Sequence, residues 1–201
     1  MRKLAILVPV FAFLSLAQLA FSQQGDAMFG GGTLLSSGTS YCGLSSCVIP
    51  EKGGFYPSVS ADVIFRKRIG FNFETTWRGA EGAYGVPGGQ PYRPIIYDFN
   101  AMYQPKLGKK VGADLMAGIG GQSTRFYVGY CTNGFTCNPY VSSDHFLVDV
   151  GGGIRYYVWN HVFVRPEAHF YHITNNTDVF NNNNVVRVGA SIGYTIGGGP
   201  D

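Results

Sequence analysis

Hydrophobic and polar residues alternate with a period of two along most of the chain after residue 25. In one stretch, Phe146, Val148 and Val150 share one parity, while Asp149 and Arg155 occupy the other. Alternation of this kind predicts β-strands with one apolar and one polar face. Eight segments show it, at residues 27–35, 58–65, 69–78, 95–104, 111–119, 146–158, 162–171 and 186–196. No segment shows the 3.6-residue period of an amphipathic helix, so we expect an all-β protein.

The two faces of these strands differ in a way that favours a membrane barrel. The apolar parity ends in aromatic residues, as expected for girdles at a membrane interface: Phe65, Trp77, Tyr103, Tyr156 and Tyr194. The other parity carries charges in mid-strand beside many glycines, and a narrow barrel with a polar interior needs such small residues. A soluble barrel or sandwich is the alternative, and solubility without detergent would identify it.

The connections between the segments alternate in length. Short turns fall at 66–68, 105–110 and 160, and long loops fall near 36–55, 79–92, 127–143 and 174–184. Short turns on one rim and long loops on the other are typical of outer-membrane barrels. The predicted fold is an eight-stranded antiparallel up-and-down transmembrane β-barrel.

Composition supports this class and excludes others. Charged residues make up 13% of the 201 residues, against a globular norm of roughly 25%. The chain has 29 glycines, 15% aromatic residues and a net charge of only +3. These values exclude a disordered tail, a coiled coil and a strongly basic nucleic-acid binder. We expect one β domain and no nucleic-acid partner.

The first 22 residues have the layout of a secretory signal peptide. Met1-Arg2-Lys3 is basic, residues 4–21 carry no charge, and Ala20-Phe21-Ser22 is a small-x-small triplet. We expect residues 1–22 to be removed and residues 23–201 to form the barrel domain. An uncleaved transmembrane anchor is the alternative, because eighteen uncharged residues can just span a bilayer.

Four cysteines occur as two close pairs, Cys42 with Cys47 and Cys131 with Cys137. Four cysteines allow three pairings, which sequence alone does not resolve. Two local disulfides are the simplest hypothesis, since an exported protein can keep them oxidised. A zinc site is disfavoured because neither pair has CxxC spacing and no histidine lies close to either pair. We therefore expect no metal and no cofactor.

The polar parity predicts an ionic interior. Its charged members are Asp62, Glu74, Arg78, Asp98, Asp114, Asp149, Arg155, Arg165, Glu167, His169 and Arg187. Buried charges must pair, or each costs several kcal/mol. Six carboxylates and four guanidiniums nearly neutralise one another. The network either plugs and stiffens the barrel or opens as a narrow gated conductance.

Three stretches and the signal peptide carry a family resemblance. The stretches are 27–32 (AMFGGG), 150–158 (VGGGIRYYV) followed by 164–167 (VRPE), and 188–194 (VGASIGY). With these the chain resembles the OmpA/OmpX-like outer-membrane β-barrel domain family over residues 26–196. The resemblance implies a monomer in outer-membrane lipid with a structural or surface-interaction role, loops open to an extracellular partner, and no catalytic residues.

Two other functions remain open. One is a narrow pore or small-solute channel. The other is an enzyme, because His172-Ile173-Thr174-Asn175 faintly resembles the His-x-Ser-Asn stretch of lipid A deacylases. Period two puts His172 and Thr174 on the same outward face. The nucleophile position holds Thr, and only Asp178 could orient the histidine, whereas a triad needs all three roles.

Overall fold

The computed structural model describes residues 24–43, 47–65, 68–85, 89–127, 130–132 and 136–197, without the side chains of 130–132 and 136–138. The predicted signal peptide, residues 1–22, lies outside the described residues. Within the described part of the chain, no helix is long and apolar enough to cross a membrane.

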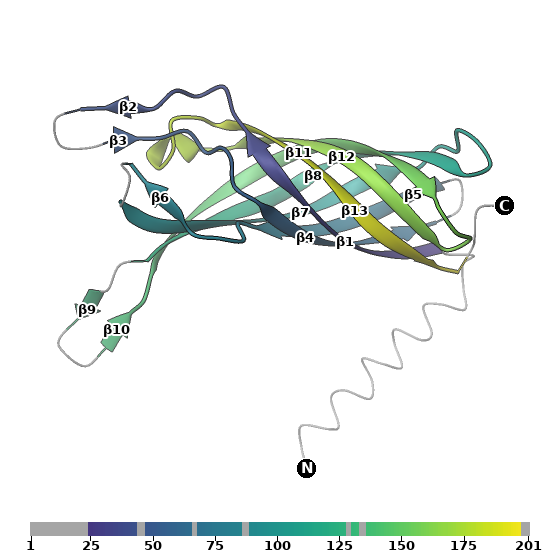
Figure 1. Ribbon diagram of the computed structural model, residues 1–201, viewed down its shortest axis with the longest axis horizontal. Coiled ribbons are helices and arrows are strands. Elements are labelled where there is room, and N and C mark those ends of the chain that lie inside the picture. Colours follow the sequence, from purple (N-terminus) through teal and green to yellow (C-terminus); the bar gives the residue numbers. More distant parts are fainter. Residues whose placement is uncertain are drawn as a thin grey trace, which may run out of the picture.

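Eight long strands close into an antiparallel barrel (Figure 1). They are β1 (Gln24–Leu35), β4 (Tyr56–Ile64), β5 (Ile69–Trp77), β7 (Gln90–Tyr103), β8 (Val111–Phe126), β11 (Val141–Tyr157), β12 (Val162–Ile173) and β13 (Asn184–Ile196). Each pairs with the next in sequence, and β1 pairs with β13 to complete the ring. The predicted eight-stranded up-and-down barrel is therefore confirmed.

The shorter elements lie in the long loops at the rim opposite the two ends of the described chain (Figure 1). We call this rim the loop rim and the other the turn rim. The elements are β2 (Tyr41–Cys42), β3 (Cys47–Val48), β6 (Gly82–Tyr84), β9 (Tyr130–Thr132), β10 (Thr136–Asn138) and the 3₁₀ turn η2 (Asn176–Asp178).

Three strands extend further toward the loop rim than the sequence pattern indicated. β7 begins at Gln90, β8 continues to Phe126, and β11 begins at Val141. The extensions pair with one another, with Phe126 opposite both Tyr92 and Val141. Their residues do not alternate between apolar and polar. The apolar pattern thus ends below the loop rim, while backbone pairing continues.

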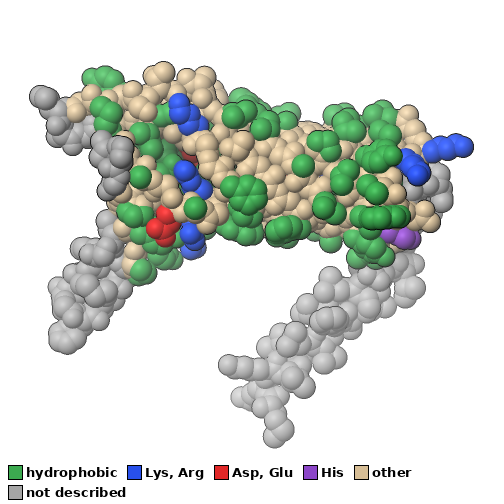
Figure 2. Space-filling model, in the orientation of Figure 1, with side chains coloured by type: hydrophobic (Ala, Val, Ile, Leu, Met, Phe, Trp, Pro, Cys, Tyr) green, Lys and Arg blue, Asp and Glu red, His purple; other side chains and the backbone are tan. Residues whose placement is uncertain are grey.

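The apolar parity faces outward and the ionic parity faces inward. Phe71, Val148 and Ile192 are 45%, 41% and 63% exposed, whereas Glu74 and Asp149 are fully buried. On the face shown in Figure 2, charged side chains gather near the two rims, and the wall between them carries scattered hydrophobic side chains. A soluble sandwich would bury the apolar parity, so this arrangement excludes that alternative.

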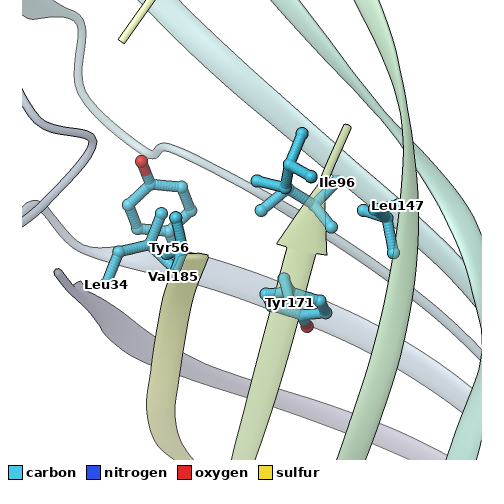
Figure 3. Packing of buried hydrophobic residues seen from close by; sticks show 7 residues of the cluster. Leu34, Tyr56, Ile96, Leu147, Tyr171 and Val185 are labelled. Carbon is cyan, nitrogen blue, oxygen red and sulfur yellow. The ribbon is translucent and has the colours of Figure 1, made fainter. Parts of the chain in front are cut away.

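The interior also contains apolar layers, which the alternation did not predict. Near the loop rim, side chains from six strands converge into one cluster (Figure 3): Leu34, Tyr56, Ile96, Leu147, Tyr171, Ile173 and Val185. Toward the turn rim lie two smaller clusters, Met28 with Tyr157 and Phe163, and Ile64 with Met102 and Met116. All of these residues occupy the inward parity, so the interior is a packed core with ionic and apolar parts.

Candidate functional site

Arg155 is the centre of one ionic group inside the barrel. It projects inward from β11 and pairs with Asp26 of β1, with Asp62 of β4 at 2.9 Å and with Asp114 of β8 at 3.1 Å. Its guanidinium also lies 4.1 Å from the centre of the Phe163 ring. One side chain therefore connects four strands across the interior.

Arg165 connects this group to a second one. It lies 3.4 Å from both Asp62 and Asp114, and its Nε donates to Glu167 at 2.7 Å. Its terminal nitrogen also lies 3.8 Å from Glu74. Because Arg165 shares two carboxylates with Arg155, the charges form one continuous network rather than isolated pairs.

The second group surrounds Arg187 and His169. Arg187 pairs with Glu74 and, at 3.1 Å, with Glu167. The Nδ1 atom of His169 lies 2.9 Å from a carboxylate oxygen of Asp149. The imidazole ring of His169 also stacks on the ring of Tyr171. Asp98 accepts a hydrogen bond of 2.7 Å from the side-chain amide of Asn100.

The structure buries ten of the eleven predicted interior residues inside the barrel: Asp62, Glu74, Asp98, Asp114, Asp149, Arg155, Arg165, Glu167, His169 and Arg187. Arg78 is the exception. It follows the last residue of β5, is half-buried, and donates a 2.6 Å hydrogen bond to the Tyr92 hydroxyl. Arg78 keeps the predicted inward parity, but because β5 ends at Trp77 it lies at the loop end of the interior, beside Tyr92.

Asp26 belongs to the interior and was missed by the sequence reasoning. The pattern began at residue 27, because Gly30-Gly31-Gly32 interrupts the parity of the first strand. β1 in fact begins at Gln24, so Asp26 shares the inward face with Met28. The shared parity of Asp26, Met28 and Leu34 was the signal that could have identified it.

The buried acids change the charge balance of the interior. Eight carboxylates, of Asp26, Glu51, Asp62, Glu74, Asp98, Asp114, Asp149 and Glu167, face four guanidiniums, of which that of Arg78 is half-buried. The interior carries a formal excess of four negative charges before any proton or cation is bound. The near-neutrality expected from sequence does not hold, because two further acids, Asp26 and Glu51, join the set.

The mouth at the loop rim is covered by residues 174–183. Val179 and Phe180 pack on Tyr92, with Ile49 and Phe126 beside them. From the sequence, this Asn-rich stretch was predicted only to be a loop. Its apolar pair, Val179-Phe180, is the signal that it packs against the barrel.

Glu51 lies buried beneath this cover. Its backbone N–H donates to the Asn182 side chain at 2.7 Å, and the Asn176 amide donates to its carboxylate at 3.2 Å. Burial raises the pKa of Glu51 from its ordinary value of 4.5 to about 7. The docked loop therefore covers a carboxyl group whose pKa lies near neutral pH.

The disulfide predictions have different outcomes. Cys42 and Cys47 form a disulfide at the β2–β3 ribbon, which confirms the local pairing. Cys131 and Cys137 are opposite each other in the backbone register of β9 and β10. Their side chains lie outside the described residues, so this pairing remains a prediction.

The residues of the enzyme hypothesis are at the loop rim. His172 and Thr174 are exposed, and the Nδ1 of His172 donates to Asn184 at 2.7 Å. A second histidine, His145, hydrogen-bonds the Ser143 hydroxyl at 2.9 Å. Among the side chains that the structure describes, neither histidine has a carboxylate within ion-pair distance.

No protein-family model matches the chain, and no curated protein matches it in sequence. Solved structures do match. A neisserial surface protein A superposes with a TM-score of 0.59 at 16% identity, over 86% of this chain and 96% of that one. The fold is that of a small outer-membrane β-barrel.

Two further structures have the same fold. The N-terminal barrel domain of Pseudomonas aeruginosa OprF gives a TM-score of 0.54 at 10% identity, covering 88% of this chain and 98% of that domain. Yersinia pestis Ail, solved with the heparin analogue sucrose octasulfate, gives a TM-score of 0.53 at 10% identity. The match covers 87% of this chain and 98% of that one. Identities this low show the shared fold alone.

Proposed function

We propose that this chain is a non-enzymatic outer-membrane barrel with a structural and surface-interaction role, and that it acts as a monomer. The observation that carries the proposal is the inverted arrangement of the strands. Apolar residues such as Phe71 and Ile192 are exposed around the barrel, while the ions are buried within it. Only a hydrocarbon surround makes such an exterior favourable, and only a closed barrel satisfies every strand there.

The proposed location follows from the same arrangement together with the leader. Residues 1–22 would direct export, and residues 23–201 would fold into the outer membrane. Membrane fractionation followed by a heat-modifiable gel shift tests this directly. We expect the mature chain in the outer-membrane fraction, with faster migration before boiling than after it. Recovery of the folded chain in the soluble fraction without detergent would overturn the proposal.

The packed interior favours a plug over a pore. The apolar cluster of Leu34, Tyr56 and Ile96 fills the loop end, and Phe180 covers the mouth above it. At the turn rim, a cavity of about 30 Å³ is lined by Gln104 and Arg155 among others. That volume is about the share of one water molecule in the liquid.

Planar-bilayer recording separates the plug from the pore. We expect no steady open state for the wild-type barrel, because opening would break interior ion pairs. A steady wild-type conductance that changes in Arg155→Ala would instead establish a narrow channel. Lys52→Ala, an exposed change in a loop away from this cavity, is the control.

The loops are the proposed contact surface for an extracellular partner. The β2–β3 ribbon and the β9–β10 ribbon project beyond the loop rim (Figure 1), and the Cys42–Cys47 disulfide closes the first of them. The projecting ribbons would lie clear of the lipid, while the rim beneath them is held by the barrel. Deletion of residues 41–48 should leave the heat-modifiable shift intact, since these residues lie outside the barrel sheet.

The absence of enzyme activity is also part of the proposal. His172 donates to an asparagine, and a serine-type triad requires a carboxylate at that position. Mass spectrometry of lipid A from cells with and without the protein tests this. Unchanged acylation supports the non-enzymatic role, and loss of an acyl chain that requires His172 would refute it.

A further inference from the structure

Glu74, Glu167 and His169 form a compact, fully enclosed group of potential metal ligands. One carboxylate oxygen from each glutamate and one ring nitrogen of the histidine all lie within 4.8 Å of one another. The three residues come from β5 and β12, on different parts of the barrel wall. The fold alone brings Glu74 to the other two.

The histidine is oriented as metal-binding histidines are. Its Nδ1 lies 2.9 Å from a carboxylate oxygen of Asp149, and because a carboxylate only accepts, Nδ1 carries the proton. The other nitrogen, Nε2, is buried and has no hydrogen-bond partner. A carboxylate on one ring nitrogen fixes the tautomer that presents the other nitrogen to a metal.

Other atoms around the group are also without hydrogen-bond partners. They are Oε2 of Glu74, Oδ2 of Asp98 and Oδ1 of Asp149, all buried. The three acids belong to the interior with its excess of four negative charges. Glu74 pairs with Arg187 and Asp149 with His169, but each keeps a buried oxygen without a hydrogen bond. Such oxygens are costly, so further positive charge would stabilise the interior.

We propose that this group binds one divalent transition-metal ion of the zinc type inside the barrel. Glu74, Glu167 and the Nε2 of His169 are the ligands, and Asp149 is the positioning residue for the histidine. Imidazole with carboxylates suits zinc, whereas magnesium and calcium take oxygen ligands. The proposal concerns the interior and does not depend on where the barrel resides in the cell.

The geometry requires only a small contraction. Zinc binds nitrogen and oxygen at about 2.0–2.2 Å, so tetrahedral ligand atoms lie about 3.4 Å apart. The three atoms, which lie within 4.8 Å of one another, therefore need to approach by at most about 1.4 Å. Arg187 holds the other oxygen of Glu74, and Oε2 has no hydrogen bond but lies 3.8 Å from Arg165. Glu167 accepts from Arg165 and Ser191 at Oε2 and from Arg187 at Oε1, which leaves Oε1 a second lone pair.

Because the group is enclosed, the metal must be loaded as the barrel folds. The mature chain is unfolded in urea with a chelator, and then refolded into detergent micelles with Zn²⁺ or with chelator alone. After free metal is removed, zinc is measured by mass spectrometry on the heat-modifiable, folded fraction. We expect one zinc ion retained per folded chain. Retention of essentially none would show that protons balance the interior, and would overturn the proposal.

The variants locate the site. His169→Gln should abolish retention, whereas His172→Gln is the control, because His172 lies on the same strand but faces outward. Equal retention by His169→Gln and wild type would also overturn the proposal. If His169→Gln fails to fold, X-ray absorption of the zinc-loaded wild type shows whether a histidine is among the zinc ligands. One imidazole with carboxylate oxygens supports the site, and oxygen ligands alone contradict it.

Discussion

At the scale of single residues, the fold depends on a few guanidiniums that each satisfy several carboxylates. Arg155 is fully buried and holds Asp26, Asp62 and Asp114 together. An interior with more acids than bases makes each such arginine difficult to replace. Removing Arg155 takes away the arginine of Asp26 and leaves Asp62 and Asp114 to Arg165 alone.

Arg155→Met should therefore lower the free energy of unfolding by about 3–5 kcal/mol, the usual cost of breaking a buried ion pair from one side. The measurement is urea unfolding of the refolded barrel, followed by tryptophan fluorescence. Lys109→Met is the control, because Lys109 is exposed at a turn and should change the value by less than about 0.5 kcal/mol. Equal effects of the two changes would contradict the role assigned to Arg155.

The second prediction at this scale concerns the small residue beneath His169. A Cβ added at Gly151 would lie 2.5 Å from Nδ1 of His169 and 2.9 Å from its Cε1. Gly151→Ala should displace the ring from Asp149 and cost about 1–3 kcal/mol through overpacking. Gly108→Ala is the control, since a Cβ there has nothing within 4 Å. Unfolding free energies of the two variants in the same detergent provide the comparison.

At the scale of elements, the structure of the 174–183 loop differs most from what the sequence predicts. Asn176 is buried because Glu51, Gln122 and the backbone of Asn182 supply its hydrogen-bond partners, and Phe180 contributes the apolar contact. An Asn-rich sequence indicates a turn without indicating what the turn packs against. The long strands β7, β8 and β11 provide the wall that receives it.

Docking of this loop should weaken as pH rises. Glu51 has a folded pKa of about 7, above its ordinary value of 4.5, so the docked state holds a proton that the undocked state releases. That contribution is complete below about pH 4.5 and is lost as pH rises through about 7. Glu51→Gln should remove this dependence and protect the loop at pH 8.

Hydrogen exchange of residues 174–183 in wild type and Glu51→Gln measures the effect. Comparing the two proteins at the same pH cancels the intrinsic pH dependence of exchange. We expect similar protection at pH 5 and greater protection of the variant at pH 8. If wild type and Glu51→Gln are equally protected at pH 5 and also at pH 8, Glu51 does not control docking.

At the scale of the whole molecule, the exposed apolar belt predicts the depth of the barrel in a bilayer. Trp77 ends β5 near the loop rim, and Trp159 lies in the turn between β11 and β12 and is 70% exposed. Tryptophan prefers the interface between headgroups and chains. The two rings therefore mark opposite interfaces.

Brominated lipids test this placement in the single-tryptophan variants Trp77→Phe and Trp159→Phe. Bromine near the headgroup end of the acyl chains should quench each remaining tryptophan more strongly than bromine near the chain end. Quenching of both at the bilayer centre would contradict the proposed span. Absence of quenching in both would show that the belt does not contact lipid.

The sequence by itself determined the class, the number of long strands, their faces and the alternation of turns and loops. The reason is local: successive side chains point to opposite faces of any strand, so period two fixes which residues face the same way. The inward burial of Glu74, Asp149 and Arg187 follows directly from that parity. The Cys42–Cys47 disulfide likewise depends on residues close in sequence.

Only the tertiary structure decided which inward residues meet. Height inside a barrel depends on strand tilt and stagger, which parity does not specify. These brought Asp26 to Arg155 and Glu74 to His169, and left Arg78 at the loop end of the interior. They also separated the apolar layers from the ionic ones and placed the 174–183 loop over Glu51. The charge excess of the interior results from this closure.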